Sequence, residues 1–312
     1  MNYVVTGGAG FIGSHIVEEL VRQKHDVVII DNLFSGKLEN IQPFLKHKKV
    51  RFVQGSITDL PLLKKSFKGA DGVFHEAAIA SVPYSVANPD ETHGVNLTGT
   101  LNVLIAARES GAKNILFASS AAVYGDRPVF PKQEEMSPDL LSPYAVSKLA
   151  GENYCSVFSR LYGMRCVSLR YFNVFGPRQD PASPYSGVIT KFITGTLANR
   201  PLRIFGDGKQ TRDFVYVKDV VQANLSAMKH GAPDVYNIAR GERIDLLGLV
   251  SLIAQVTGIT VPITFAPPAQ GDVRDSVADI SRARDAFDYT PEYTIEAGLK
   301  ETIAWFRKQN PA

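Results

Sequence analysis

The residues with the clearest chemical potential are Tyr144 and Lys148, four positions apart, together with an earlier pair of serines, Ser119 and Ser120. On a helix, residues four apart lie on one face, so the phenol and the ammonium group would lie side by side. A neighbouring cation stabilises a phenolate, so we expect the pKa of Tyr144 to fall from about 10 toward neutrality. Such a phenolate is a general base for a sugar or alcohol hydroxyl whose carbon gives up hydride. Residues with this spacing also occur by chance on many helices, so the spacing alone does not establish catalysis. The catalytic interpretation further requires that other segments bind a hydride acceptor.

A glycine-rich segment, Thr6–Gly13, follows the first predicted strand and opens the first predicted helix. Glycines in this context permit a tight turn and let the backbone approach a pyrophosphate, which rests on the helix N-terminus. Asp31 ends the second predicted strand, where a carboxylate binds ribose hydroxyls and repels a 2′-phosphate, so NAD is favoured over NADP. A glycine turn that serves only helix packing is the alternative. The residues expected along the same edge are Asn32, Ser35 and Gly36.

The elements that must position these groups alternate between strand and helix through the first half of the chain. This alternation predicts an α/β fold with a doubly wound, parallel, Rossmann-type sheet. The predicted strands are Asn2–Thr6, Asp26–Asp31, Arg51–Gln54, Gly72–His75, Asn114–Ala118 and Arg165–Arg170. The predicted helices are Phe11–Gln23, Leu60–Lys68, Asn96–Glu109 and Tyr144–Tyr162.

After Tyr171 the pattern changes, with prolines and glycine marking loops, and it predicts a smaller, discontinuous C-terminal α/β lobe that caps the carboxyl edge of the sheet. We expect residues 1–172, with about 213–240, to form the NAD-binding domain, and 173–212 with 241–312 to form the substrate lobe. The strands predicted here are Leu202–Phe205, Asp213–Tyr216 and Val235–Asn237, the last returning to the main sheet. The helices are Val188–Ala198, Asp219–His230, Leu246–Thr257 and Ile295–Lys308.

Composition narrows the class of protein. The 312 residues carry a formal charge of +3 and no long Lys/Arg-rich block, so no nucleic acid partner is expected. The two cysteines, Cys155 and Cys166, lack the spacing of a metal site or a disulfide scaffold and fit a reducing cytosol. Met1 leads almost directly into a strand and no apolar run reaches about 18 residues, so we expect neither a signal peptide nor a membrane span. The sequence therefore predicts a cytoplasmic protein without a metal.

Further segments occur in a set order: His75–Ala78, Ser119–Gly125, Arg170–Pro177, Thr211–Asp219 and Gly271–Arg274. With the glycine loop and the Tyr-x-x-x-Lys spacing, they resemble the extended short-chain dehydrogenase/reductases that act on nucleotide sugars, most closely the UDP-hexose 4-epimerases. The similarity covers essentially the whole chain. It implies an isomerase of carbohydrate and galactose metabolism with tightly bound NAD, which interconverts UDP-glucose and UDP-galactose through a transient 4-keto sugar. It also implies a homodimer paired through the helices Asn96–Glu109 and Tyr144–Tyr162.

The same resemblance assigns roles to individual residues. Tyr144 would be the base, Lys148 its electrostatic partner and a ligand of the cofactor ribose, and Ser120 the hydroxyl that orients the C4 oxygen, with Ser119 able to share that task. The other cofactor residues implied are Gly7, Gly10, Phe11, Ile12, Gly13, Ser56, Ile57, Ala77, Ala78, Ala80, Asn96 and Tyr171. The substrate residues implied are Asn173 and Arg212 for the diphosphate, Arg203 and Phe205 near uracil, and Gly187, Val188, Asp272, Arg274 and Ser276.

Departures from the family pattern bear on specificity. Ala269 stands where many relatives carry a second diphosphate arginine, and the small Ser276 leaves room for an N-acetyl group at C2. Ala121 and Ala122 cannot transfer protons, which counts against a 4,6-dehydratase. A UDP-glucuronate 4-epimerase, another NAD-dependent nucleotide-sugar oxidoreductase or decarboxylase, and an NAD-binding sensor without catalysis remain as alternatives.

Overall fold

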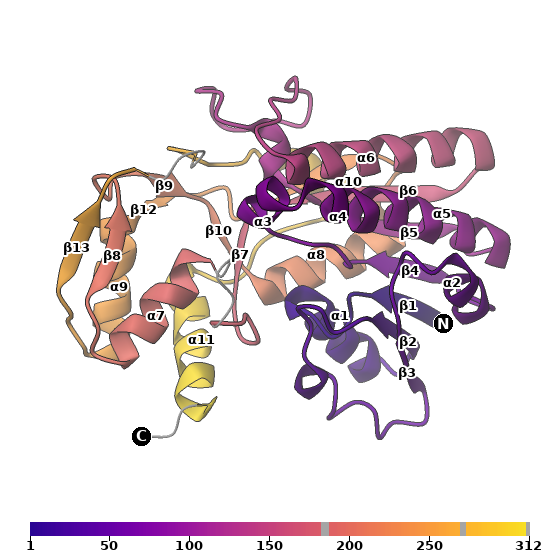
Figure 1. Cartoon of the computed structure of the whole chain (residues 1–312), viewed down its shortest axis with the longest axis horizontal. Coiled ribbons are helices and arrows are strands. Elements are labelled where there is room, and N and C mark those ends of the chain that lie inside the picture. Colours follow the sequence, from indigo (N-terminus) through magenta and orange to yellow (C-terminus); the bar gives the residue numbers. More distant parts are fainter. Residues whose placement is uncertain (182–186, 269–272, 310–312) are drawn as a thin grey trace.

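The computed structural model describes residues 1–181, 187–268 and 273–309, and its larger part is built on one parallel sheet (Figure 1). Hydrophobic, β-branched runs form its buried strands. Their order across the sheet is β11-β6-β5-β4-β1-β2-β3, and each neighbouring pair is parallel. The strands are β1 (Asn2–Thr6), β2 (Asp26–Asp31), β3 (Val50–Gln54), β4 (Gly72–His75), β5 (Asn114–Ser120), β6 (Arg165–Tyr171) and β11 (Val235–Ile238).

Helices cover both faces of this sheet, as the doubly wound prediction required. The first face packs on α1 (Phe11–Arg22), α8 (Val217–His230) and α10 (Ser281–Phe287). The opposite face packs on α2 (Leu60–Ser66), α5 (Gly99–Ser110) and α6 (Pro143–Tyr162). Each face thus has its own apolar core, and the carboxyl ends of β1, β2, β4 and β5 meet at one edge.

A smaller part of the chain lies beyond that edge, on the left of Figure 1. Its parallel pair β8 (Leu202–Phe205) and β13 (Ile263–Ala266) packs with three helices around a separate apolar cluster. These helices are α7 (Val188–Leu197), α9 (Leu246–Thr257) and α11 (Ile295–Gln309). Two short pairs link the parts: β7 (Asn173–Phe175) with β10 (Phe214–Tyr216), and β9 (Thr211–Arg212) with β12 (Ile244–Asp245).

The predicted main-sheet strands are confirmed to within two residues, and β11 does return to the sheet beside β6. The elements without a prediction are short. They are β7, β9, β12, β13 and α10, the single turns η1 (Leu38–Asn40) and η3 (Ala121–Tyr124), and the helices α3 (Val82–Ala87) and α4 (Pro89–His93). The helix expected from Asn96 begins instead within the π-helical turn η2 (Gly94–Thr98) and continues as α5.

Candidate active site and cofactor pocket

The glycine loop joins β1 to α1 with its backbone exposed toward a pocket. A Cβ on Gly13 would lie 2.2 Å from the carbonyl oxygen of Gly7, and one on Gly7, whose φ is +68°, would lie 2.6 Å from the amide nitrogen of Ala77. Gly10 is the N-cap of α1, and no side chain accepts from the first amides of this helix. A side chain at either glycine would therefore fill the space in front of the loop. This space ends at the backbone amides of the α1 N-terminus, which are suitable donors for a pyrophosphate.

Asp31 lies at the end of β2, beside this cradle, and its carboxylate is buried. Oδ2 accepts from the amide of Ala9 at 3.0 Å and Oδ1 accepts from the amide of Leu33 at 2.8 Å. Burial raises the pKa of Asp31, and the two backbone hydrogen bonds act against that rise. A Cβ on Gly36 would lie 2.8 Å from Oδ1, so this glycine leaves space directly against the carboxylate. The arrangement fits a carboxylate that receives ribose hydroxyls.

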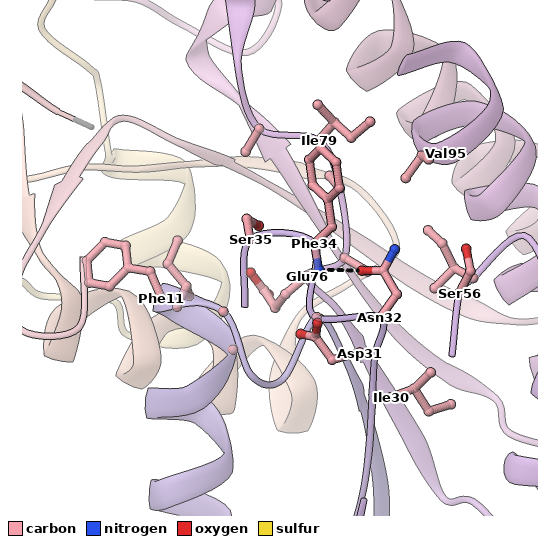
Figure 2. Close-up of a pocket in the computed structure, with 18 of the residues that line it drawn as sticks. Phe11, Ile30, Asp31, Asn32, Phe34, Ser35, Ser56, Glu76, Ile79 and Val95 are labelled. Atoms are coloured by element: carbon pink, nitrogen blue, oxygen red, sulfur yellow. Dashed lines mark hydrogen bonds between the residues drawn. The ribbon is translucent and has the colours of Figure 1, made fainter. Parts of the chain in front are cut away.

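Most of the residues predicted for the cofactor line this one pocket, which Figure 2 shows in close-up. Asn32 turns the chain after β2, since its Oδ1 accepts from the amide of Phe34 at 3.1 Å. The predicted residues in the lining are Gly7, Gly10, Phe11, Ile12, Gly13, Asp31, Asn32, Ser35, Ser56, Ile57, Ala77, Ala78 and Ala80. The lining residues that had no prediction are Ile30, Phe34, Gly55, Glu76, Ile79, Glu91 and Val95.

Two residues expected to surround the cofactor act instead on its surroundings. The Asn96 side chain is buried and forms two hydrogen bonds with the backbone of Ile79. Its Oδ1 accepts from the Ile79 amide at 2.7 Å, and its Nδ2 donates to the Ile79 carbonyl oxygen at 3.1 Å. Asn96 thereby fixes the loop after β4 that carries the lining alanines. The Tyr171 hydroxyl lies 2.9 Å from Glu76 Oε1 and 2.9 Å from Asn224 Oδ1. Neither Asn96 nor Tyr171 is among the residues of the pocket lining described above.

Tyr144 and Lys148 lie in the first two turns of α6, which begins where the Ser142 side chain accepts from the amide of Ala145. Lys148 is buried, its Nζ donates to the carbonyl oxygen of Ala118 at 2.6 Å, and it lies 5.8 Å from the centre of the Tyr144 ring. The Ser120 hydroxyl accepts from the amide of Ala122 at 3.1 Å and forms a hydrogen bond with Tyr144. The structure thus brings phenol, ammonium and hydroxyl together at the carboxyl end of β5.

The expected lowering of the Tyr144 pKa is wrong for this structure. Burial raises the pKa of Tyr144, the hydrogen bond with Ser120 lowers it, and the negative charge of Glu76 raises it further. Burial also lowers the pKa of Lys148 to about 8, against the carboxylates of Glu76 and Glu152. The reason is desolvation, because a phenol buried away from water resists ionisation.

Ser119 does not share the task of Ser120. Its side chain is buried and its hydroxyl donates to Glu152 Oε1 in a very short contact. Glu152 is itself held by Arg170, whose Nε and Nη2 donate to Oε1 and Oε2 at 2.9 and 2.8 Å. A hydroxyl committed to a buried ion pair between β6 and α6 is a structural group. The interpretation of Ser119 as a substrate ligand is therefore corrected.

The residues predicted for the substrate lie on the smaller part of the chain and on the segments that link it to the sheet. Asn173 begins β7 and is exposed, Gly187 is the N-cap of α7, and Val188 is the first residue of that helix. Gly187 makes no side-chain hydrogen bond to the first amides of α7. Asp272 and Ala269 lie outside the described residues.

A second pocket lies at the open end of β8 and β13. Its walls are aromatic, with Phe205 43% and Phe265 60% exposed, and Arg274 closes it by pairing with Asp207 at 3.2 Å. Arg203 lies on the same exposed face of β8, 4.9 Å from the Phe205 ring centre. Flat apolar walls with a guanidinium at the rim suit a nucleobase. Phe265 was not predicted as a substrate residue, because its strand β13 lies outside the sequence segments that resemble the family.

Arg212 lies on β9, next to the segment that carries Arg274 and Ser276. Its Nη1 donates to the carbonyl oxygen of Arg274 at 3.0 Å, and the amide of Thr211 donates to the same carbonyl at 3.0 Å. Ser276 is half-buried two residues further along. The Arg212 side chain therefore contacts the backbone of the segment that carries Arg274 and Ser276. Among the described residues, no cluster of His, Cys, Asp or Glu could hold a metal ion.

Comparisons with known proteins agree with this geometry. A sequence model described as the NAD dependent epimerase/dehydratase family matches residues 3–239. The chain is 40% identical to the UDP-glucose 4-epimerase of Thermotoga maritima solved with UDP-glucose, with 99% of each chain covered and a TM-score of 0.94. It is 42% identical to the UDP-N-acetylglucosamine 4-epimerase of Methanobrevibacter ruminantium in complex with UDP-N-acetylmuramic acid, covering 99% and 98% of the two chains with a TM-score of 0.95.

A third solved structure bears on the cofactor. The UDP-glucose 4-epimerase of Thermus thermophilus, solved in complex with NAD, is 38% identical over 98% of this chain and 99% of that one, with a TM-score of 0.90. The fold of this chain therefore recurs in all three solved structures over essentially its whole length.

Proposed function

Since the chain belongs to the NAD dependent epimerase/dehydratase family, we propose that it is an NAD-dependent 4-epimerase of UDP-hexoses, which interconverts UDP-glucose and UDP-galactose through a transient 4-keto sugar. One observation carries this choice within the family. Tyr144 interacts with Ser120 and with Glu76, a lining residue of the dinucleotide pocket, and the two positions after Ser120 are Ala121 and Ala122. Tyr144 and Ser120 can support proton transfer at C4, whereas Ala121 and Ala122 cannot act as the second acid–base pair that a dehydration requires.

NAD supplies the acceptor for the C4 hydrogen of the sugar and later its donor. Tyr144 takes the proton of the C4 hydroxyl and returns it after the 4-keto sugar has turned over. Ser120 orients the C4 oxygen and, through its hydrogen bond, lowers the pKa of Tyr144. Lys148 keeps a positive charge near the developing phenolate and binds the cofactor ribose. These groups act through position and fixed charge in a water-poor site.

Binding of the UDP moiety falls to the smaller lobe, which we assign to residues 173–212 and 241–312, apart from α10, which packs on the main sheet. Arg212 and Arg274 hold the diphosphate with Asn173 and the N-terminus at Gly187 and Val188, and Phe205 with Arg203 meets the uracil. The arginine fork suits a diphosphate because it pairs two phosphate oxygens at once. The small Ser276 leaves space for an N-acetyl group, so UDP-N-acetylhexosamines are substrates as well; Asp272 belongs to the same segment.

We also propose that the enzyme is a homodimer of the cytoplasm in galactose metabolism. Val146, Val157 and Leu161 are 49, 46 and 68% exposed on one face of α6. A row of exposed apolar side chains on a long helix suits an isologous interface with a second copy. The cysteines, Cys155 and Cys166, are buried and free, which suits a reducing compartment. Along the described residues, no helix is long and apolar enough to cross a membrane.

The test is incubation of the purified protein with single UDP-sugars in the absence of reductant. UDP-glucose, UDP-galactose, their N-acetyl forms and UDP-glucuronate are supplied in turn, and products are separated by chromatography while absorbance follows the nicotinamide. The proposal expects 4-epimers of the hexoses without net formation of NADH. Stoichiometric NADH, loss of CO2 from UDP-glucuronate, or no product from any UDP-hexose would each reject it.

A further inference from the structure

Glu76 is a carboxyl group of the cofactor pocket with no part in the mechanism described above. It follows β4 directly and lies among the lining residues in Figure 2. Its Oε1 lies 2.9 Å from the hydroxyl of Tyr171 on β6, and that hydroxyl lies 2.9 Å from Oδ1 of Asn224 on α8. The three side chains form a row from the pocket into the fully buried interior, where Asn224 is 0% exposed.

This row has one proton too few if Glu76 is ionised. A phenol carries a single hydrogen, whereas a carboxylate and an amide oxygen both require a donor. The Asn224 amide cannot be turned to offer its NH2 group, because Nδ2 donates to the carbonyl oxygen of Val220 at 2.7 Å. Turning it would set two acceptors against each other at that distance. An ionised Glu76 therefore leaves either Asn224 Oδ1 or its own Oε1 facing an oxygen lone pair.

A protonated Glu76 completes the row. Its O–H donates to the oxygen of Tyr171, and Tyr171 donates in turn to Asn224. Ionisation of Tyr171 is no alternative, because burial and the charge of Glu76 raise the pKa of this phenol well above its usual value. Buried polar groups that each find a partner are the rule in folded proteins, and unsatisfied ones cost free energy.

We propose that Glu76 is held as a neutral carboxylic acid by the Tyr171–Asn224 pair, and that this neutrality keeps a negative charge away from Tyr144. Glu76 is thus a positioning residue: its ionisation at high pH sets the point above which Tyr144 becomes a less effective base and kcat falls. The effect on catalysis rests on the function proposed above, whereas the protonation state does not.

The charges around Glu76 support this assignment. Burial raises the pKa of Glu76 to about 7, although the charge of Lys148, and a hydrogen bond that Tyr171 could donate to the ionised carboxylate, both act to lower it. Tyr144 and Lys148 are the titratable groups that face it from α6, Tyr171 faces it from β6, and α8 presents the neutral Asn224. The adjacent His75 is neutral, since burial lowers its pKa to about 3. Above pH about 7 Glu76 ionises, and its charge then raises the pKa of Tyr144.

Infrared spectroscopy of the holoprotein tests the protonation state without any turnover. A protonated carboxyl has a C=O stretch separate from that of a carboxylate, so we expect a band below pH about 7 that is lost above it. Glu76→Gln should remove this band, because an amide donates to Tyr171 without titrating. The matched control is Glu91→Gln, which removes another carboxyl of the pocket, one that accepts from the Tyr84 hydroxyl, and should leave the band in place.

Asn224→Leu provides an independent variant with the opposite effect. It removes the competing acceptor, so Tyr171 can donate to Glu76 and stabilise the carboxylate, and the band should disappear at a lower pH than in the unsubstituted protein. In turnover, Glu76→Gln should flatten the alkaline limb of the kcat profile. The proposal is overturned if Glu76→Gln removes no protonated-carboxyl band, or if Asn224→Leu leaves its titration where it was. Absence of epimerase activity with the band present rejects the proposed function alone.

Discussion

Ser119 and Ser120 are neighbours in β5, yet their hydroxyls contact different groups, and alanine at each position should separate stability from catalysis. Ser119→Ala removes the hydrogen bond to the buried carboxylate of Glu152 and leaves the Arg170–Glu152 pair in place. A hydrogen bond to a charged group is worth about 1.5–3 kcal/mol. We therefore expect the free energy of unfolding to fall by about 2 kcal/mol, with kcat close to that of the unsubstituted protein.

Ser120→Ala should show the reverse. It removes the hydroxyl that bonds Tyr144 and orients the C4 oxygen, and the loss of one such preorganised donor lowers kcat by about 10²-fold. The same hydroxyl caps the turn η3 by accepting from the amide of Ala122, so the free energy of unfolding should fall by about 1 kcal/mol at most.

Both variants are measured by two assays under matched conditions. Urea unfolding is followed by circular dichroism at one fixed NAD concentration, because a ligand that binds only the folded state adds to apparent stability. Epimer formation from UDP-glucose at saturation gives kcat. If Ser119→Ala lowered kcat as much as Ser120→Ala and left stability unchanged, Ser119 would face the substrate, and its structural role would be refuted.

Three further predictions concern charge, specificity and assembly. The folded pKa of Lys148, about 8, lies below its unfolded value of about 10.4, so burial of the charge costs stability below pH 8 and this cost fades as the pH rises toward the unfolded pKa. Lys148→Met should thus raise the free energy of unfolding at neutral pH by about 1–3 kcal/mol while abolishing activity, and lower stability in urea would contradict this. Ser276→Tyr should remove turnover of UDP-N-acetylglucosamine and spare UDP-glucose; equal losses on both would exclude the steric explanation. Leu161→Arg should convert the proposed dimer to a monomer, which light scattering would detect as a halved molar mass. A molar mass equal to that of the unsubstituted dimer would show that α6 is not part of the interface.

The main sheet and the cofactor cradle could be predicted because local signals and global fold agree there. Buried parallel strands are continuous apolar runs, and the glycines between β1 and α1 have a backbone role that sequence spacing expresses. The helices α3 and α4 escaped prediction because Pro83, Asn88 and Pro89 are typical of turns. In the structure, the Ser81 side chain accepts from the amide of Tyr84, and both prolines occupy first-turn positions that need no amide.

The site itself was harder to predict where burial decides the chemistry. Alternation along a strand places Ser119 and Ser120 on opposite faces, a signal in the sequence that would have separated their roles. The pKa of Tyr144 could not be inferred in the same way, because desolvation depends on the packing of α6 against β5. The role of Glu76 could not be inferred from the sequence, because it depends on contacts between distant residues. Tyr171 lies 95 positions from Glu76 and 53 positions from Asn224 along the chain.

In the proposed reaction, one hydrogen leaves C4 of the sugar and returns to the same carbon within a closed site. UDP-glucose carrying deuterium at C4 is incubated with the purified protein in ordinary water until the epimers equilibrate, and C4 is then read by NMR. We expect full retention of deuterium at C4 in both UDP-glucose and UDP-galactose. Loss of deuterium to water, or epimerised product with hydrogen at C4, would contradict it.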